Sequence, residues 1–479
     1  MSAAHTVPSY AIARNADTAI PPVIVGAGPA GTRAAATLVR HGLRPVVLDE
    51  SPRSGGQIYR RTPQGFSRSS KELYGTEAAR ADAVHAAFDA MLAAGSIDYR
   101  PNTLVWNAQP DVLDLLAQHT RKVSAMPWHD VIVATGATDR VLPIPGWTLP
   151  GVYTLGGAQV ALKYQGCAIG SQVVLAGTGP LLYLVAYQYV KAGANVVAVL
   201  DTAPANARMT ALKAMWTMPS VLLKGVQLTA CLKLRGIPVH HGVTLEQVHG
   251  DTSVQAIQWR DSRGHTQRTA CTAVGLGYAL RPETQLADLL GCSFEFSALH
   301  RCHVPVLDDA RRSSVPGVYL AGDGAGIMGA DAAELSGELA ALALLQDRGL
   351  AVSSSRIATL QAQLAKVQGF REGLEQAFPF PENWAAQAPD ALVVCRCENV
   401  TAGEMRNTAK ACDAKEINRL KALCRVGMGR CQGRMCGAAA VEVLAHAQGI
   451  PVAQAGRIRA QAPIKPLPVD VQLEEGDHV

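Results

Sequence analysis

The sequence lacks any strong excess of charge. Its 479 residues include 44 Lys and Arg against 39 Asp and Glu. We take the resulting net charge of +5 to be dispersed along the chain. Nucleic-acid binding needs a larger and more clustered basic excess, so no nucleic-acid partner is expected.

Targeting and membrane-spanning segments are also missing. Residues 1–22 contain no apolar core of signal-peptide length, so we expect a short N-terminal extension on a cytoplasmic protein. Residues 173–200 form the one long apolar stretch, but Gly177, Gly179 and Pro180 interrupt it. A buried β-α-β unit explains these breaks better than a transmembrane helix does. A peripheral association with a membrane stays open.

Cysteine is sparse before residue 395 and dense after it. Six of the eleven cysteines lie between Cys395 and Cys436. Cytoplasmic thiols are normally reduced, so a dense local group indicates a metal or an iron–sulfur cluster rather than disulfides.

A complete dinucleotide-type β-α-β unit is present in residues 23–50. An apolar strand leads into Gly26, Gly28 and Gly31, with Pro29 and Ala30 between the last two, and an Ala-rich helix follows. A second strand ends at Asp49-Glu50. The glycines permit a tight turn, close approach of a pyrophosphate and close helix–strand packing, and Glu50 is placed to accept from ribose hydroxyls.

A second β-α-β unit of this type begins about 150 residues later. An apolar strand from Gln172 meets Gly177 and Gly179, and a following strand ends at Asp201. Leu182 stands where the third glycine belongs, which predicts a displaced or tilted helix and disfavours a working nicotinamide site.

Three further motifs suggest contact with a bound cofactor. Gly55-Gly56-Gln57 allows backbone to pass close to a ligand. Ala134-Thr135-Gly136 ends a buried strand, and Gly322-Asp323 ends another. The Asp323 carboxylate is placed to bond a ribityl chain or the edge of a flavin pyrophosphate.

Two close cysteine pairs follow a proline-containing stretch that we interpret as a linker. Cys395 and Cys397 form the first pair, and Cys431 and Cys436 form the second. Four thiolates suit a tetrahedral zinc or a [2Fe–2S] cluster, and the tight C-x-C pair favours the cluster. Gly427, Gly429 and Gly433 would leave backbone N–H groups free to bond cluster sulfurs.

These motifs together resemble the two-dinucleotide-domain flavoproteins of the glutathione- and thioredoxin-reductase type. The resemblance implies an α/β fold with bound FAD and a second dinucleotide-binding-like domain inserted in the first. The cysteine-rich end resembles the bacterioferritin-associated-ferredoxin-like (BFD-like) [2Fe–2S] domain, which is small and helical. No redox-active cysteine pair precedes Cys395, so disulfide reductase chemistry is not expected.

The expected organisation is an N-terminal extension (1–20), a FAD domain in two segments (21–150 and 275–375), the inserted domain (151–274), a linker (376–392), the cluster domain (393–455) and a C-terminal arm (456–479). The expected FAD-site residues are Gly26, Gly28, Pro29, Ala30, Gly31, Glu50, Gly56, Gln57, Ala134, Thr135, Gly136, Gly322 and Asp323. The expected cluster ligands are Cys395, Cys397, Cys431 and Cys436.

The whole arrangement resembles the larger, FAD- and [2Fe–2S]-containing (alpha) subunit of multi-subunit amine dehydrogenases, a group that includes opine oxidases, D-hydroxyproline dehydrogenases and hydrogen cyanide synthase. The resemblance implies amine oxidation on the flavin of a smaller partner subunit, with electrons relayed through this chain to a quinone or another acceptor. It leaves open a small third subunit and an FMN at the subunit interface. No catalytic acid or base is expected in this chain.

Two other functions compete with this interpretation. One is an NAD(P)H-dependent, ferredoxin-type reductase that uses the second dinucleotide domain, which Leu182 disfavours. The other is a scaffold without cofactors, which the complete glycine motif and the paired cysteines disfavour.

Overall fold

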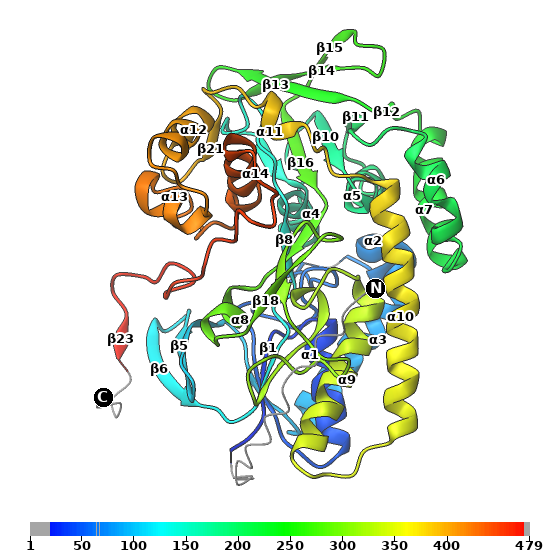
Figure 1. The fold of residues 1–479 in the computed structure, drawn as a ribbon. Helices are drawn as coiled ribbons and strands as arrows, with labels where there is room; N and C mark the ends of the chain where they lie inside the picture. The colour runs from blue at the N-terminus through cyan, green and yellow to red at the C-terminus, as the bar shows by residue number, and fades with distance from the viewer. Residues whose placement is uncertain (1–19, 64, 67, 474–479) are drawn as a thin grey trace.

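The computed structural model describes residues 20–63, 65, 66 and 68–473. Most of the expected N-terminal extension and the last residues of the expected arm, 474–479, lie outside the described residues. The described chain forms a two-segment domain, an inserted domain and a helical C-terminal domain, which pack against one another (Figure 1).

The first domain is built on a parallel sheet with strand order β20-β7-β1-β2-β3. The strands are β1 (Val23–Val25), β2 (Val46–Leu48), β3 (Asp98–Arg100), β7 (Val131–Val133) and β20 (Val318–Leu320). Strand β20 pairs with β7 in register Val318↔Val131, although the inserted domain separates them in the sequence. The first domain is therefore completed only by the later chain segment.

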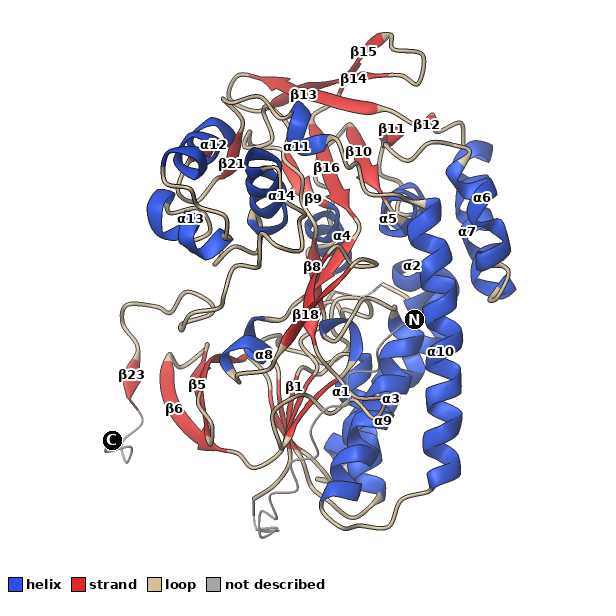
Figure 2. Cartoon of the chain, in the orientation of Figure 1, coloured by secondary structure: helices blue, strands red, loops and turns tan. Residues whose placement is uncertain are grey.

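Both faces of this sheet are covered, because successive side chains of a strand point to opposite sides. Ile24, Val47 and Ile132 pack against helices, whereas Val23, Val46 and Val131 pack against an antiparallel meander. The helices are α1 (Pro29–Arg40), α3 (Ala78–Ala93), α9 (Ala330–Asp347) and α10 (Ser354–Ala377), and the meander is β4 (Thr103–Ala108), β5 (Val112–Ala117) and β6 (Lys122–Pro127). The short helix α2 (Ser70–Tyr74) packs on α3 instead. Figure 2 shows α1, α3, α9 and α10 on one side of this sheet and the meander on the other.

The inserted domain has a second parallel sheet, in the order β12-β11-β10-β16-β9. Its elements are β9 (Val152–Thr154), α4 (Leu155–Lys163), β10 (Val173–Thr178), α5 (Pro180–Lys191), β11 (Val196–Asp201), α6 (Ala207–Met215), α7 (Pro219–Leu234), β12 (Val239–His241) and β16 (Ala273–Tyr278), with an antiparallel meander of β13 (Thr244–Gly250), β14 (Val254–Arg260) and β15 (Thr266–Ala270). Leu182 is fully buried among apolar residues of β10 and β11. It acts as a core residue at the position of the missing glycine.

Short elements connect the two domains. They are β8 (Ala137–Asp139), β17 (Leu280–Pro282), α8 (Gln285–Leu289), β18 (Phe294–Ser297) and β19 (Cys302–Pro305). Strands β8 and β17 pair antiparallel and form a two-stranded connection between the large sheets.

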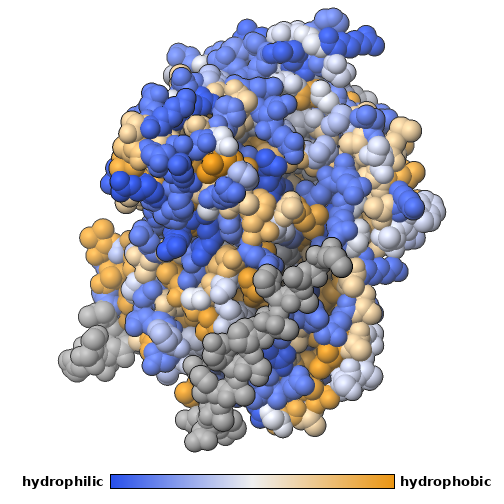
Figure 3. Space-filling view, in the orientation of Figure 1, coloured by the Kyte–Doolittle hydropathy of each residue, from blue (hydrophilic) through white to orange (hydrophobic). Residues whose placement is uncertain are grey.

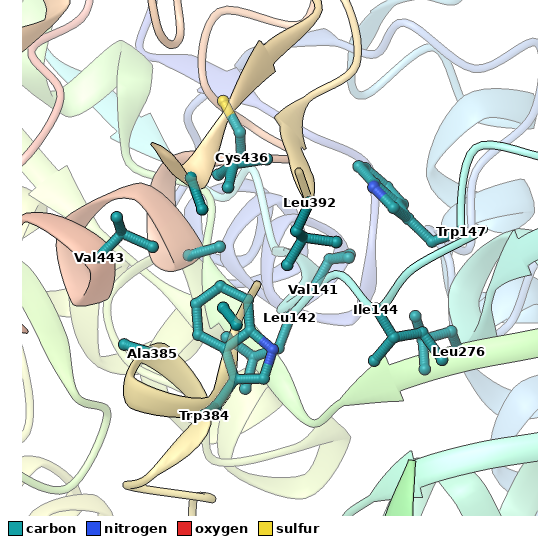
Figure 4. Packing of buried hydrophobic residues seen from close by; sticks show 14 of the residues in the cluster. Val141, Leu142, Ile144, Trp147, Leu276, Trp384, Ala385, Leu392, Cys436 and Val443 are labelled. Carbon is teal, nitrogen blue, oxygen red and sulfur yellow. The ribbon is translucent and has the colours of Figure 1, made fainter. Parts of the chain in front are cut away.

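The C-terminal domain shares a core with the inserted domain. It contains β21 (Val393–Cys395), β22 (Val400–Thr401), α12 (Ala402–Ala411), α13 (Ile417–Cys424) and α14 (Gly437–Gln448). Leu392 and Val443 lie in one apolar cluster with Val174 and Ala198 of the inserted domain and with Leu142 of the preceding segment; Figure 4 shows part of this cluster. The cysteine-rich domain is therefore fixed to the rest of the chain by packing.

The segment expected to be a linker, 376–392, is part of this packing. It includes the short helix α11 (Trp384–Gln387), and Trp384 and Ala385 are buried in the shared core. The Trp384 indole donates to the Pro143 carbonyl at 2.9 Å, and the Trp147 indole donates to the Val393 carbonyl at 2.7 Å. The segment joins two domains, but it is packed rather than extended.

The expected arm also packs on this chain. Ile464 is buried and its N–H donates to the Trp106 carbonyl at 3.0 Å. Strand β23 (Gln472–Leu473) then pairs in parallel with β6. Among the described residues, no helix is long and apolar enough to span a membrane.

Candidate flavin and cluster sites

A cavity of about 1310 Å³ lies at the carboxyl ends of the first sheet. Twelve of the thirteen expected FAD-site residues line it, and Gly31 is the exception. The residues are Gly26, Gly28, Pro29, Ala30, Glu50, Gly56, Gln57, Ala134, Thr135, Gly136, Gly322 and Asp323. The structure thus brings together motifs that are up to 300 residues apart, at the sheet edge where α/β folds bind ligands.

The glycine-rich turn could not hold larger residues. A Cβ atom at Gly26 would lie 2.4 Å from the Ala134 carbonyl oxygen, and Gly26 has φ +109°. A Cβ atom at Gly31 would lie 1.8 Å from the Gly26 carbonyl oxygen. Helix α1 begins directly after Gly28, so its N-terminal end faces the cavity. The turn and the helix terminus together can therefore accept a dinucleotide phosphate.

Asp49, rather than Glu50, holds the turn in place. The Asp49 carboxylate accepts the N–H groups of Ala27 and Ser51, each at 2.6 Å. Burial raises the pKa of Asp49. Glu50 lies at the rim of the cavity and forms an ion pair with Lys465 from the C-terminal arm. Sequence reasoning missed Asp49, although its position next to the buried strand β2 was a signal.

The Gly55-Gly56 pair brings a second loop against the turn. The Gly55 N–H donates to the Ala27 carbonyl at 2.8 Å, and a Cβ atom at Gly56 would lie 2.9 Å from the Gly28 Cα atom. Both glycines have positive φ, at +116° and +63°. The close backbone approach at Gly55-Gly56 is therefore an approach to the glycine-rich turn.

Asp323 organises the start of helix α9. Its Oδ1 atom accepts the N–H groups of Met328 and Gly329, both at 2.9 Å. Burial raises the pKa of this carboxyl group. Gly337 lets α9 approach α1, because a Cβ atom there would lie 2.1 Å from the Ala30 carbonyl oxygen. The α9 terminus and the α1 terminus consequently face the same cavity.

The four expected ligand cysteines contact one another in pairs in the C-terminal domain: Cys395 with Cys436, Cys436 with Cys431, and Cys431 with Cys397. Cys436 donates hydrogen bonds that lower the pKa of Cys395 to about 6 and that of Cys431 to about 5. Cys397 and Cys431 also interact through their side chains. In the part of the chain that the structure describes, no three His, Cys, Asp or Glu side chains are grouped as they would be around one metal ion.

Backbone N–H groups surround the sulfurs. The N–H groups of Gly427 and Glu398 donate to Cys395, and those of Gly433 and Met435 donate to Cys431. A Cβ atom at Gly429 would lie 2.3 Å from the Cys397 Cβ atom. Donors of this kind stabilise the negative charge of a thiolate-bound cluster. Arg425 and Arg434, by contrast, form ion pairs with Glu398 and Glu283.

One short segment connects the cavity with the cysteine loop. The Thr135 hydroxyl donates to the Glu283 carbonyl at 2.8 Å, and the Glu283 N–H donates to the Gly136 carbonyl at 2.9 Å. On its other side, Arg434 Nε donates to the Glu283 carboxylate at 2.9 Å.

Two neighbours of Glu283 strengthen this connection. Gln285 donates to the Gln432 carbonyl at 2.7 Å, and Arg281 donates to the Arg434 carbonyl at 3.0 Å. Arg434 and Met435 line the same cavity as the glycine-rich turn. The cysteine loop thus forms part of the wall of the candidate flavin site.

In the second dinucleotide-like domain, the acidic residue at the end of the second strand of the β-α-β unit is already hydrogen-bonded within the protein. Asp201 is fully buried and accepts from Thr178 at 2.9 Å, Tyr183 at 2.6 Å and Arg208 at 2.7 Å. The Ala203 N–H donates to the same carboxylate at 2.9 Å. These bonds occupy the carboxylate that would bind a nucleotide ribose in this type of fold.

A model of the pyridine nucleotide-disulphide oxidoreductase family matches residues 21–337. The chain belongs to this family. Membership implies FAD in the first domain and confirms the expected arrangement of two dinucleotide-type domains. The sarcosine oxidase A3 domain model matches residues 392–473, which include all four expected ligand cysteines and most of the arm.

Relatives within the family extend over almost the whole chain. An opine oxidase subunit from Rhizobium meliloti is 36% identical over 458 residues, which cover 93% of this chain and 85% of that protein. The HcnB subunit of hydrogen cyanide synthase from Pseudomonas aeruginosa is 33% identical, and the match covers 93% of this chain and 97% of that protein. The expected resemblance to this group of subunits is confirmed.

A solved structure supports the fold independently. L-proline dehydrogenase from P. horikoshii superposes with a TM-score of 0.66 over 94% of this chain and 79% of that chain, at 18% identity. This likeness confirms the mixed α/β architecture of the oxidoreductase, with its helical C-terminal region.

Proposed function

We propose that this chain is the electron-relay subunit of a multi-subunit amine dehydrogenase of the opine or D-hydroxyproline type. A smaller subunit with its own FAD would oxidise the amine. Electrons would then pass through FAD and a [2Fe–2S] cluster in this chain to an acceptor such as a quinone. The complex would be cytoplasmic or peripheral to the membrane, and it could include a small third subunit and an interfacial FMN.

The shared wall between the flavin cavity and the cysteine loop carries this proposal. Glu283 contacts the Thr135–Gly136 turn through its backbone and Arg434 through its side chain. FAD would accept and release electrons in pairs, and the cluster would carry them singly. The protein's own residues would position both groups and keep water from the space between them.

The residues assigned to each group follow from the cavity and the sulfur contacts. Gly26, Gly28 and the α1 terminus would hold the FAD pyrophosphate, and Glu50 would accept from the ribose. Cys395, Cys397, Cys431 and Cys436 would ligate the cluster, with N–H donors from Gly427 and Gly433. This chain would supply no catalytic acid or base.

The NAD(P)H-dependent reductase is a weaker alternative. Asp201 is buried, and its hydrogen bonds to Tyr183 and Arg208 oppose a role in nucleotide binding. Leu182 fills the position where close packing against a nucleotide-binding turn needs glycine.

Cofactor analysis of the co-purified complex tests the proposal. We expect this chain to retain FAD, with two irons and two labile sulfides and the electron paramagnetic resonance signal of a reduced [2Fe–2S] cluster. Zinc in place of iron, or a chain that purifies without flavin, would contradict it.

A further inference from the structure

The four expected ligand cysteines differ in their exposure. Cys395 and Cys436 are buried, whereas Cys397 and Cys431, which interact through their side chains, are partly exposed. Met435, next to Cys436 in the sequence, lines the flavin cavity. The cysteine loop therefore has an inner side at the flavin cavity and an outer side at the protein surface.

The C-x-C turn and the segment before Cys431 lie against each other on the outer side. A Cβ atom at Gly429 would lie 2.3 Å from the Cys397 Cβ atom and 3.1 Å from the Glu398 Oε1 atom. Arg425 pairs with the same carboxylate at 2.8 Å. The two segments therefore form one continuous surface around the partly exposed cysteines.

This surface carries exposed cations and an exposed apolar side chain. Arg396, Arg425 and Arg430 are exposed, and Met428 is 38% exposed. Unlike Arg425, both Arg396 and Arg430 lack an ion-pair partner among the residues that the structure describes. The Arg396 guanidinium lies over the Trp147 ring, 5.6 Å from its centre. We call the residues Arg396, Arg425, Met428 and Arg430 the cysteine-loop patch.

The domain that carries this patch is basic as a whole. Residues 393–455 contain nine basic and five acidic residues, whereas the rest of the chain contains 35 basic and 34 acidic ones. The expectation that the net charge is dispersed along the chain is therefore wrong. In Figure 3, mainly hydrophilic residues cover the region where Figure 1 places α12 and α13 of this domain.

We propose that an acidic, one-electron carrier protein docks on the cysteine-loop patch and takes electrons there. Exposed cations around a redox centre attract an acidic partner and raise its rate of association. Arginine and methionine, which make up the patch, are both enriched in protein–protein interfaces. Methionine also adapts its shape to the partner that covers it.

The position of the patch suits the release of electrons. The inner side of the loop faces the flavin cavity, so the patch lies on the opposite side of the cysteines from the electron donor. The carrier accepts one electron in each encounter, and no bond or proton is transferred. The inference rests on the proposed function for the cluster itself, and it adds the place and the kind of partner that receives the electrons.

Binding of succinylated cytochrome c to the purified complex tests the proposal. Succinylation converts the lysines of this one-electron carrier to carboxylates, so native, basic cytochrome c is the matched control. We expect salt-sensitive binding of the succinylated form only. The R396Q/R430Q variant should bind it roughly tenfold more weakly, because each exposed charge pair contributes a factor of about three. The R263Q/R268Q variant removes two exposed arginines from the inserted domain and should bind normally.

Stopped-flow spectra of the photoreduced complex measure the electron transfer itself. At low ionic strength, R396Q/R430Q should slow the reduction of succinylated cytochrome c while the iron content and the midpoint potential of the cluster stay unchanged. Iron and sulfide analysis separates the two proposals: a chain without a cluster would contradict the proposed function, although binding to the patch could still be measured.

Three results would overturn the docking proposal. One is equal binding of succinylated cytochrome c by the two double-arginine variants. Another is a lower midpoint potential in R396Q/R430Q with unchanged binding, because the arginines would then act only on the cluster. The third is a complex that does not bind succinylated cytochrome c because a partner subunit covers the patch.

Discussion

Arg434 and Glu283 form an ion pair, with 2.9 Å between the Arg434 Nε atom and the carboxylate, where the cysteine loop meets the flavin cavity. Both side chains are largely buried, at 14% and 13% exposed. The pair therefore fixes the position of the candidate cluster relative to the candidate flavin.

Replacement of Arg434 by Gln should weaken the connection between the cysteine loop and the flavin cavity. The loss of one partner of a buried pair leaves Glu283 uncompensated, which we expect to lower the free energy of unfolding by about 3 kcal/mol. Both cofactors should stay bound, but stopped-flow spectra should show slower electron transfer from flavin to cluster. The R425Q variant is the control, because Arg425 is 64% exposed and its pair with Glu398 should contribute less than about 1 kcal/mol.

Flavin binding should depend on the absence of a side chain at residue 31. In the G31A variant a Cβ atom would meet the Gly26 carbonyl oxygen at 1.8 Å and displace the turn. We expect loss of the flavin absorbance after purification. The G369A variant places a Cβ atom in open space on α10, and it should keep its flavin and gain about 0.5 to 1 kcal/mol of stability.

The iron content should depend on the four expected ligand cysteines and not on other cysteines of the C-terminal domain. The C431S variant should lose iron and the cluster absorbance while FAD remains, because all the residues expected to hold FAD belong to the two segments of the first domain. The exposed Cys412 lies outside the sulfur group, so C412S should retain full iron content. Normal iron content in C431S would show that the ligand set is wrong.

Lys163 should make the stability of the chain depend on pH. It is 2% exposed, its ammonium donates to the Ile58 carbonyl at 2.8 Å, and burial lowers its pKa to about 7. The unfolded chain, with an ordinary lysine pKa near 10.5, therefore binds more protons than the folded chain between about pH 7 and pH 10. The stability penalty of this lysine is largest below pH 7 and disappears as the pH rises towards 10.

The K163M variant should consequently be more stable than the parent chain at pH 7, by on the order of 2 kcal/mol, with a gain that shrinks towards pH 10. Denaturant unfolding at several pH values measures this difference. The K366M variant changes an exposed lysine on α10 and should show no such pH dependence. A pH-independent effect of K163M would mean that Lys163 is not desolvated.

The local motifs of the sequence predicted which residues would lie together, because much of the physical cause lies within each motif. Gly31 is required by a contact within one β-α-β unit, with the Gly26 carbonyl oxygen, so its spacing was sufficient. The contact of Gly26 with the Ala134 carbonyl oxygen, by contrast, joins distant segments. The paired cysteines likewise predicted their convergence. Asp49 was missed because its role depends on the Ala27 and Ser51 N–H groups, which only the folded turn brings together.

Features that depend on distant surfaces could not be predicted in this way. Trp384 lies in the middle of the segment expected to be a linker, and it is buried in a core that is completed by Pro143 and Trp147, more than 200 residues earlier. The connection through Glu283 also joins residues from three separate regions of the chain. Nothing in the local sequence around Glu283 indicates that it contacts both candidate sites.

Anaerobic absorption spectra test the central claim most directly. The chain is purified alone and in complex with its partner subunit, and candidate opines, D-hydroxyproline, NADH and NADPH are added in turn. The relay function predicts that an amine reduces this chain's flavin and cluster only in the complex, whereas NADH and NADPH have no effect on the chain alone. Reduction of the isolated chain by NADH or NADPH would contradict the relay function and establish a reductase.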